Sequence, residues 1–146
     1  MLKLTNLNQF YGQSHTLWDI SLEVQKGECL CVMGRNGVGK TTLMDTIMGQ
    51  HKIESGSIEF DGEDITKLSV EDRASLGIGY VPQGRQIFPL LTVEENLKIG
   101  IGARRDGLKA VPKAVYDMFP VLYDMRHRQG GDLSGGQQQQ LAIGRA

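Results

Sequence analysis

The sequence is poor in several features, and each shortage excludes a class of protein. It has two cysteines and four prolines among 146 residues, too few for a disulfide-stabilised scaffold or a proline-rich linker. No apolar run approaches the ~20 residues that a membrane-spanning helix needs. Acidic and basic side chains nearly balance, with a formal net charge of −1, so a broad basic surface for nucleic acid is not expected. These shortages favour one soluble domain, or part of one, with no nucleic-acid partner.

The residues that could bind metals or form disulfides show no pattern of either kind. Cys29 and Cys31 alternate along an apolar segment, so we interpret them as small core residues of a reducing compartment and not as a bridge or a metal pair. His15, His51 and His127 have no second ligand at metal spacing, and we assign them no role. The amino terminus shows no basic segment followed by an apolar core, so we expect a cytoplasmic protein.

The strongest motif follows a continuous apolar segment at residues 29–33. Such a segment predicts a strand covered on both faces, and the helical spacing after residue 40 predicts a helix. A glycine-rich stretch joins the two and matches the phosphate loop that cradles nucleoside triphosphates. Its residues are Gly34, Arg35, Asn36, Gly37, Val38, Gly39, Lys40, Thr41 and Thr42.

The chemistry of this loop suits a triphosphate and a magnesium ion. Glycines allow successive backbone N–H groups to turn inward, and the amino end of the helix adds unpaired amides and positive potential. Lys40 can reach the outer phosphates, and the Thr41 hydroxyl can ligate Mg²⁺, with Thr42 supplying a second hydroxyl. We therefore predict a bound nucleoside triphosphate and Mg²⁺ as cofactors, with kinases, GTPases, helicases and transport ATPases all open on this loop alone.

A second glycine-rich turn lies near the carboxyl end of the sequence. Leu133 precedes Ser134, Gly135, Gly136 and Gln137, and a helical pattern follows. A hydroxyl and glycine amides at a helix start can hold a phosphate. The alternative is an ordinary helix cap, because serine followed by glycine is common loop chemistry.

Together these two motifs resemble the ATP-binding-cassette ATPases, and the resemblance covers the whole chain. It implies that residues 134–137 contact an ATP held on the phosphate loop of a second subunit. It also implies that Tyr11 stacks on adenine and that Gln83 lies near Mg²⁺ and the attacking water. On residue type alone, Tyr11 could instead be a half-buried packing aromatic, and Gln83 could be an exposed turn residue after Pro82.

Residues 83–97 and 133–145 are similar to those of importer subunits for urea and branched-chain amino acids, with the urea type closer. This resemblance implies an ATPase that drives import of a small polar solute, at the inner face of the plasma membrane, with permease subunits and a separate solute-binding protein. The permease would contact an apolar cluster, because such a cluster at a surface suggests a partner surface. The alternative is that the cluster is a core contact under the helices. The cluster comprises Ile87, Phe88, Pro89, Leu90 and Leu91.

The expected fold class is α/β, of the phosphate-loop type, with an antiparallel β subdomain, a partial parallel core sheet and a helical subdomain. Alternation at residues 2–7 and 20–24 predicts two strands, and a turn near Gly27 is expected between the second of them and the apolar segment at 29–33. Residues 57–60 and 77–81 predict two more strands. Capping patterns begin helices at Ser69 and Thr92, and Pro112 suits the first turn of another. We divide the chain into residues 1–91 (antiparallel sheet and nucleotide-binding core), 92–128 (helical subdomain) and 129–146 (signature loop and following helix).

The family's magnesium-associated aspartate and catalytic glutamate follow the signature helix, and no residue here matches them. We therefore expect a partial cassette domain, of marginal stability alone, that binds ATP better than it hydrolyses it. Two rival interpretations stay open. One is a cassette ATPase without a membrane partner, and the other is a nucleotide-binding regulatory module without turnover.

Overall fold

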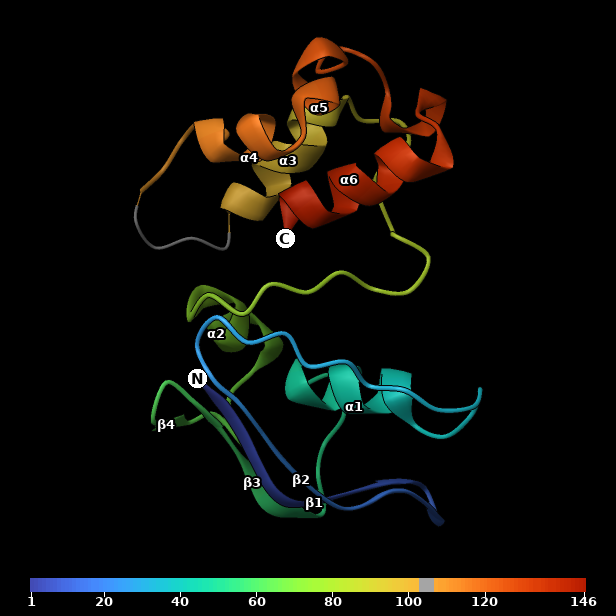
Figure 1. Cartoon of the computed structure of the whole chain (residues 1–146), viewed down its shortest axis with the longest axis vertical. Helices are drawn as coiled ribbons and strands as arrows, with labels where there is room; N and C mark the ends of the chain where they lie inside the picture. The colour runs from blue at the N-terminus through green and yellow to red at the C-terminus, as the bar shows by residue number, and fades with distance from the viewer. Residues whose placement is uncertain (103–106) are drawn as a thin grey trace. The chain divides into compact units, whose positions relative to one another are not determined.

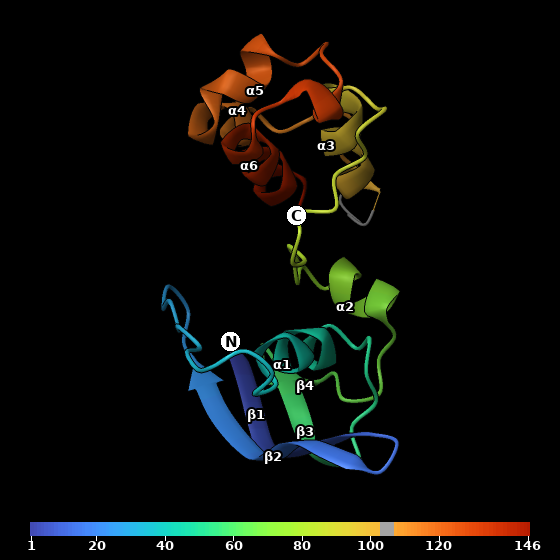
Figure 2. The same ribbon diagram turned by 90° about the vertical axis from the view of Figure 1, so that its right-hand side faces the viewer.

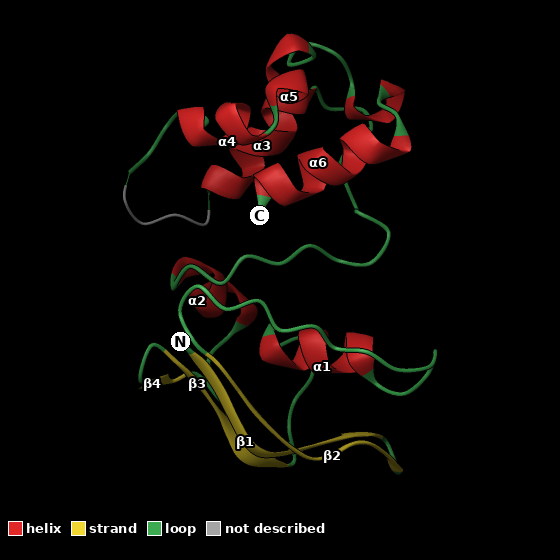
Figure 3. Ribbon diagram, in the orientation of Figure 1, coloured by secondary structure: helices red, strands yellow, loops and turns green. Residues whose placement is uncertain are grey.

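The computed structural model describes residues 1–102 and 107–146. The chain forms two compact units, Met1–Leu76 and Gly77–Ala146 (Figure 1). The first combines a sheet with two helices and the second is helical (Figure 3). Each unit has its own buried apolar residues, which is what a separately folded body requires.

An antiparallel sheet organises the first unit, as the alternating pattern predicts. Its strands are β1 (Leu2–Tyr11), β2 (Ser14–Val24), β3 (Ser55–Phe60) and β4 (Glu63–Asp64), in the order β2-β1-β3-β4. Leu4 of β1 lies opposite Leu22 on one side and Ile58 on the other. Leu4 and Ile58 are fully buried, so this register places the apolar residues on the covered face of the sheet.

Two helices belong to this unit. α1 (Lys40–Ile47) lies across one face of the sheet, as Figure 2 shows, and buries Leu43 and Ile47. α2 (Val70–Ser75) begins at Ser69, whose hydroxyl accepts a hydrogen bond from the Asp72 N–H. The cap predicted at Ser69 is therefore confirmed, and so is the phosphate-loop helix.

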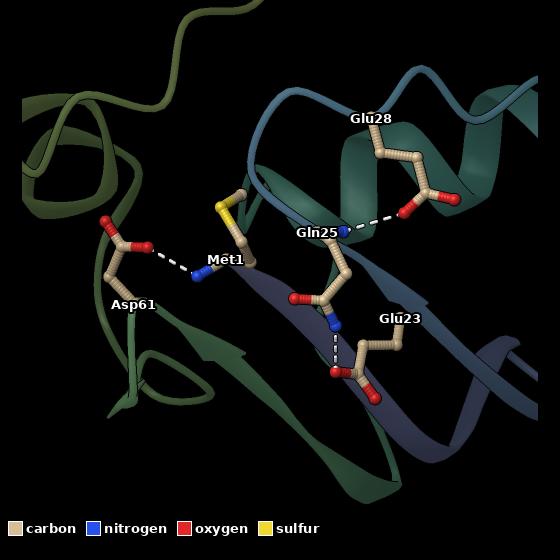
Figure 4. Close-up of polar contacts among 5 residues, drawn as sticks. All are labelled: Met1, Glu23, Gln25, Glu28 and Asp61. Carbon is tan, nitrogen blue, oxygen red and sulfur yellow. Dashed lines mark hydrogen bonds and ion pairs between the residues drawn. The ribbon is translucent and has the colours of Figure 1, made fainter.

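Polar contacts lie at the end of the sheet where β1 begins and where β2 and β3 end (Figure 4). The Met1 ammonium pairs with Asp61 in the β3–β4 turn and holds the pKa of that carboxyl below its usual value. After β2, the Gln25 N–H donates to the Glu28 carboxylate at 2.8 Å, and the Gln25 side chain donates to Glu23. Gly27 takes the left-handed conformation within this turn, with φ of 82°. The turn predicted at Gly27 is thus confirmed.

The predicted strands at residues 29–33 and 77–81 are wrong for this structure. Both segments are irregular, and Cys29, Cys31 and Met33 are exposed, Met33 by 84%. A strand needs a neighbour that takes its backbone N–H and C=O groups. Among residues 1–102 and 107–146, neither segment joins the sheet ladder. The parallel part of the core sheet is therefore absent from the described residues, and the two cysteines are not core residues.

The second unit is a helical body. Its helices are α3 (Val93–Ile101), α4 (Lys113–Met118), α5 (Pro120–Asp124), the 3₁₀ turn η1 (Gly130–Asp132) and α6 (Gly135–Arg145). α3 begins with the predicted capping box of Thr92 and Glu95, and Pro112 immediately precedes α4. None of the helices among the described residues is long and apolar enough to cross a membrane. Five buried side chains form the core of this unit: Val93, Leu97, Leu122, Leu133 and Leu141.

Candidate functional site

The phosphate loop, residues 34–42, includes the first turn of α1. The backbone before this helix takes left-handed conformations that glycine adopts most readily. Gly37 has φ of 84° and Gly39 has φ of 95°. A Cβ at Gly39 would lie 3.1 Å from the Leu17 side chain, so both the conformation and the packing call for glycine here. Around Gly37 there is no atom that a Cβ would meet within 4 Å. The backbone at that point is open to an approaching ligand.

The amino end of α1 has polar groups to offer. Gly39 is its N-cap residue and supplies no side-chain hydrogen bond. The first helical bond runs from the Leu43 N–H to the Gly39 carbonyl at 2.8 Å, so the N–H groups of Lys40, Thr41 and Thr42 precede the helical ladder. Uncapped amides at a helix start, with the macrodipole behind them, favour an anion.

Lys40 folds back over the loop that precedes it. Its ammonium donates to the carbonyl oxygens of Gly34 at 2.8 Å and Arg35 at 2.7 Å. These bonds hold the charge above the glycine backbone, and an ammonium has a third donor for another acceptor. A flexible ammonium next to the uncapped amides of α1 is suited to the outer phosphates of a nucleotide.

The remaining residues of the loop fit a magnesium nucleotide. Thr41 is exposed and Thr42 half-buried at the start of α1, so their hydroxyls are accessible. Mg²⁺ takes oxygen ligands, keeps several waters and shares phosphate oxygens, so a threonine hydroxyl beside the phosphate loop is a suitable protein ligand. Arg35, Asn36 and Val38 are exposed, and the Val38 side chain lies beside Gly34, where a Cβ would be 3.0 Å from it.

Tyr11 ends β1 in the same unit, and its ring is 47% exposed. Its hydroxyl lies 2.6 Å from Nε2 of His51, and the two rings meet edge to face with centroids 4.9 Å apart. Tyr11 is therefore not buried in the core of the first unit, and an exposed tyrosine is available to a stacking ligand. No pattern in the sequence pairs these residues, because 40 positions separate them.

Gln83 lies in the second unit, in an irregular segment, and is exposed. Arg85 and Gln86 follow with left-handed φ values of 68° and 47°, a conformation that costs non-glycine residues energy and is concentrated at functional sites. Arg85 donates to the Gln138 side chain at 3.1 Å, and Arg145 donates to the Gln86 carbonyl at 2.9 Å. The segment after Gln83 is therefore fastened to α6.

The turn at residues 134–137 is the N-cap of α6. The Ser134 hydroxyl accepts from the Gln137 N–H at 3.4 Å, and the Gln137 side chain accepts from the Ser134 N–H at 2.9 Å. The cap that the sequence offered as an alternative is therefore present. Ser134, Gly135 and Gly136 are nevertheless exposed, and a Cβ at Gly135 would lie 3.3 Å from the Arg85 guanidinium. A positive charge thus lies beside this turn.

The apolar cluster of residues 87–91 divides between two roles. Ile87 packs against the core of the second unit, whereas Phe88 is 45% exposed and Leu90 is 80% exposed. Buried Asn96 holds the segment by accepting from the Phe88 N–H at 2.8 Å and donating to the Phe88 carbonyl at 2.9 Å. Part of the cluster is a core contact and part is exposed apolar surface.

Comparisons with known proteins give a consistent result. A family model described as ABC transporter matches residues 17–146. The chain is 40% identical over its whole length to the high-affinity branched-chain amino acid transport ATP-binding protein BraG of Pseudomonas aeruginosa. It is also 40% identical to the probable branched-chain amino acid transport ATP-binding protein LivF of Archaeoglobus fulgidus. It spans 63% and 62% of the length of these two curated relatives.

The solved structures agree on the fold. One is the dimeric structure of MJ0796, a bacterial ABC transporter cassette, with a TM-score of 0.83 and 28% identity. It matches 99% of this chain and 68% of that one. A nucleotide-free ATP-binding cassette from an ABC transporter gives a TM-score of 0.85 at 28% identity, over 100% of this chain and 64% of that one.

Proposed function

Because the chain belongs to the ABC transporter family, we propose that it is the ATP-binding, energy-coupling part of an importer for a small polar solute. The names of BraG and LivF favour branched-chain amino acids, and the glutamine-rich stretch after Gly136 keeps urea as the other candidate. The observation that carries the proposal is the phosphate loop, where Lys40 lies over left-handed glycines at the uncapped start of α1.

In this proposal the first unit binds the nucleotide. The amides from Gly37 to Thr42 and the Lys40 ammonium hold the phosphates, and the Tyr11 ring stacks on adenine. The Thr41 hydroxyl would be a ligand for Mg²⁺, which would neutralise phosphate charge when bound. Gln83 belongs to the second unit, and its role as a further Mg²⁺ ligand stays a prediction. Gln83 would also orient the attacking water.

The turn at residues 134–137 would act on a second subunit's nucleotide. Its exposed hydroxyl and glycine amides, with the Arg85 charge beside them, suit a γ-phosphate. The dimeric structure of the related cassette MJ0796 supports a paired arrangement. Two nucleotides would then lie between two subunits, and the added charge would drive their closure.

We further propose that this chain of 146 residues binds ATP better than it hydrolyses it. The two groups proposed for catalysis are Lys40, a cation at neutral pH, and Gln83, an amide that does not titrate. Neither can accept the proton of an attacking water, and general bases contribute typically 10²–10⁴-fold to such reactions.

The division of the chain into residues 1–91, 92–128 and 129–146 is part of this proposal. The capping box at Thr92 and the turn η1 after Gln129 support its two boundaries. Permease subunits would contact the exposed Phe88 and Leu90, at the inner face of the plasma membrane. A separate solute-binding protein would supply the solute.

Calorimetry of magnesium ATP binding tests the nucleotide site. We expect Lys40→Ala to abolish measurable binding, because it removes the ammonium proposed to hold the outer phosphates on the phosphate loop. Lys52→Ala, which removes an exposed lysine of the same unit, is the control and should bind as the parent chain does. Retained affinity in Lys40→Ala would overturn the proposed site.

Size-exclusion chromatography with and without ATP tests the second role. Ser134→Arg should keep nucleotide binding and lose ATP-induced dimerisation, since arginine fills the exposed turn. Ser69→Arg removes the equivalent helix cap from α2, so it controls for the loss of a cap and should still dimerise. Loss of nucleotide binding in Ser134→Arg would contradict this division of roles.

A further inference from the structure

His51 connects three elements of the first unit. It lies four residues after the end of α1, and its Nε2 atom is 2.6 Å from the Tyr11 hydroxyl at the end of β1. The same nitrogen is 3.7 Å from a carboxylate oxygen of Asp45, which belongs to α1. The side chains of His51 and Asp45 are only 28% and 17% exposed. Strand end, helix and following loop therefore meet at one imidazole.

The contact with Tyr11 is a hydrogen bond in either tautomer of the imidazole. A bare Nε2 accepts from the phenol, and a protonated Nε2 donates to the phenol oxygen. The edge-to-face ring contact, with an interplanar angle of 74°, adds a second restraint. The hydroxyl of Tyr11 is held by this bond and its ring by the contact with the imidazole, while 47% of the residue stays exposed.

This restraint matters if the Tyr11 ring stacks on adenine, as proposed above. Tyr11 precedes a left-handed glycine, Gly12 with φ of 57°, in the β1–β2 hairpin, and an unrestrained aromatic side chain there would lose rotamer freedom on binding. Fixing the side chain in advance removes that cost from the binding step.

We infer that His51 is a positioning residue for adenine recognition. It holds the Tyr11 ring at a set place relative to α1, whose first turn would bind the phosphates of the same nucleotide. This inference rests on the proposed function.

Asp45 strengthens the link to the phosphate site. Thr41 and Asp45 are four residues apart in α1, so they lie on the same side of the helix. The contacts of Asp45 with His51 and of His51 with Tyr11 thus connect the Tyr11 side chain to the helix whose first turn carries Thr41. The distance between the phosphate loop and the Tyr11 ring is therefore set by the folded structure before the ligand binds.

Binding of two ligands distinguishes an effect on adenine recognition from an effect on the phosphate site. One is magnesium ATP, and the other is magnesium tripolyphosphate, which lacks the adenine and ribose. We expect His51→Ala to weaken ATP binding about three- to tenfold, the size of one lost hydrogen bond, with tripolyphosphate affinity unchanged. Tyr11→Phe, which keeps the ring and removes the hydroxyl, should do the same. The double variant should be no weaker than either single one, because both remove one interaction.

Further variants make each outcome decisive. His51→Gln retains a polar group at this position and should recover part of the loss, while Lys52→Ala should match the parent chain for both ligands. Circular dichroism establishes that each variant is folded. If the parent chain binds neither ligand, the proposed function fails. If it binds both and His51→Ala and Tyr11→Phe bind ATP unchanged, or if tripolyphosphate affinity falls equally, the positioning role is overturned.

Discussion

Arg73 donates a hydrogen bond from its guanidinium to the carbonyl oxygen of Ile47 at 2.7 Å, at the carboxyl end of the phosphate-loop helix. The same nitrogen also reaches the Thr46 carbonyl at 3.0 Å, and the other nitrogens donate to Leu68 and Thr66. Only 3% of Arg73 is exposed. A buried cation at this end complements the helix dipole and supplies a donor to the Ile47 carbonyl. The Thr46 carbonyl also accepts from the Gly49 N–H at 3.0 Å.

Replacing Arg73 should destabilise the first unit. Arg73→Ala removes the guanidinium donors of the Ile47, Leu68 and Thr66 carbonyls, so we expect a loss of ~2–4 kcal/mol in the free energy of unfolding. Arg73→Lys keeps the charge but not the fork of donors, and should lose less. Urea unfolding followed by circular dichroism measures both. Arg126→Ala, which removes an exposed arginine-to-carbonyl bond, is the control and should change little.

Asn96 is the corresponding polar anchor in the second unit. It is fully buried, and its amide nitrogen donates to the carbonyls of Phe88, Leu91 and Thr92. Asn96→Asp would face these carbonyls with carboxylate oxygen, so we expect a loss of ~3 kcal/mol or more at pH 7. The folded state would favour the protonated acid, which raises its folded pKa above the unfolded one. Stability should therefore recover as the pH is lowered to 4, and Asn96→Ala should show no such recovery.

Local chemistry explains what the sequence predicted well. The caps at Ser69 and Thr92 depend on side chains three residues apart, and the phosphate loop depends on glycines next to a lysine. Such features are encoded within one or two turns of chain, so reading the residues in order suffices.

Features that depend on distant residues were harder to predict. Residues 29–33 have the composition of a buried strand, yet a ladder partner is needed to make one, and apolar composition cannot supply it. The pairing of Tyr11 with His51 depends on how β1 and the loop after α1 are brought together, which no periodicity reports. The left-handed backbone at Arg85 and Gln86 likewise has no signal in residue type, since neither residue favours it.

The capping box of α3 predicts a pH dependence. Hydrogen bonds from Thr92, the backbone one foremost, hold the pKa of Glu95 below its ordinary value of 4.5. A depressed folded pKa gives a stabilisation that is present above the unfolded pKa and lost as the pH falls through the folded one. Glu95→Gln keeps an oxygen acceptor for the cap and should flatten this acid limb of the stability curve. Thermal unfolding between pH 3 and 7 measures it, with Glu54→Gln as the control; an unchanged acid limb in Glu95→Gln would contradict the assignment.

The bond between Arg85 and Gln138 predicts coupling between the segment after Gln83 and α6. Arg85→Ala and Gln138→Ala each remove the same 3.1 Å bond, so their effects on unfolding should fall short of additivity by about 0.5–1.5 kcal/mol. Arg85→Gly removes the bond as well but relieves a backbone φ of 68°, and should therefore be more stable than Arg85→Ala. Urea unfolding of the four variants of the cycle, with Arg85→Gly beside them, measures both effects. Strict additivity would show that the two side chains do not act together, and an Arg85→Gly variant less stable than Arg85→Ala would show that the left-handed backbone is not strained.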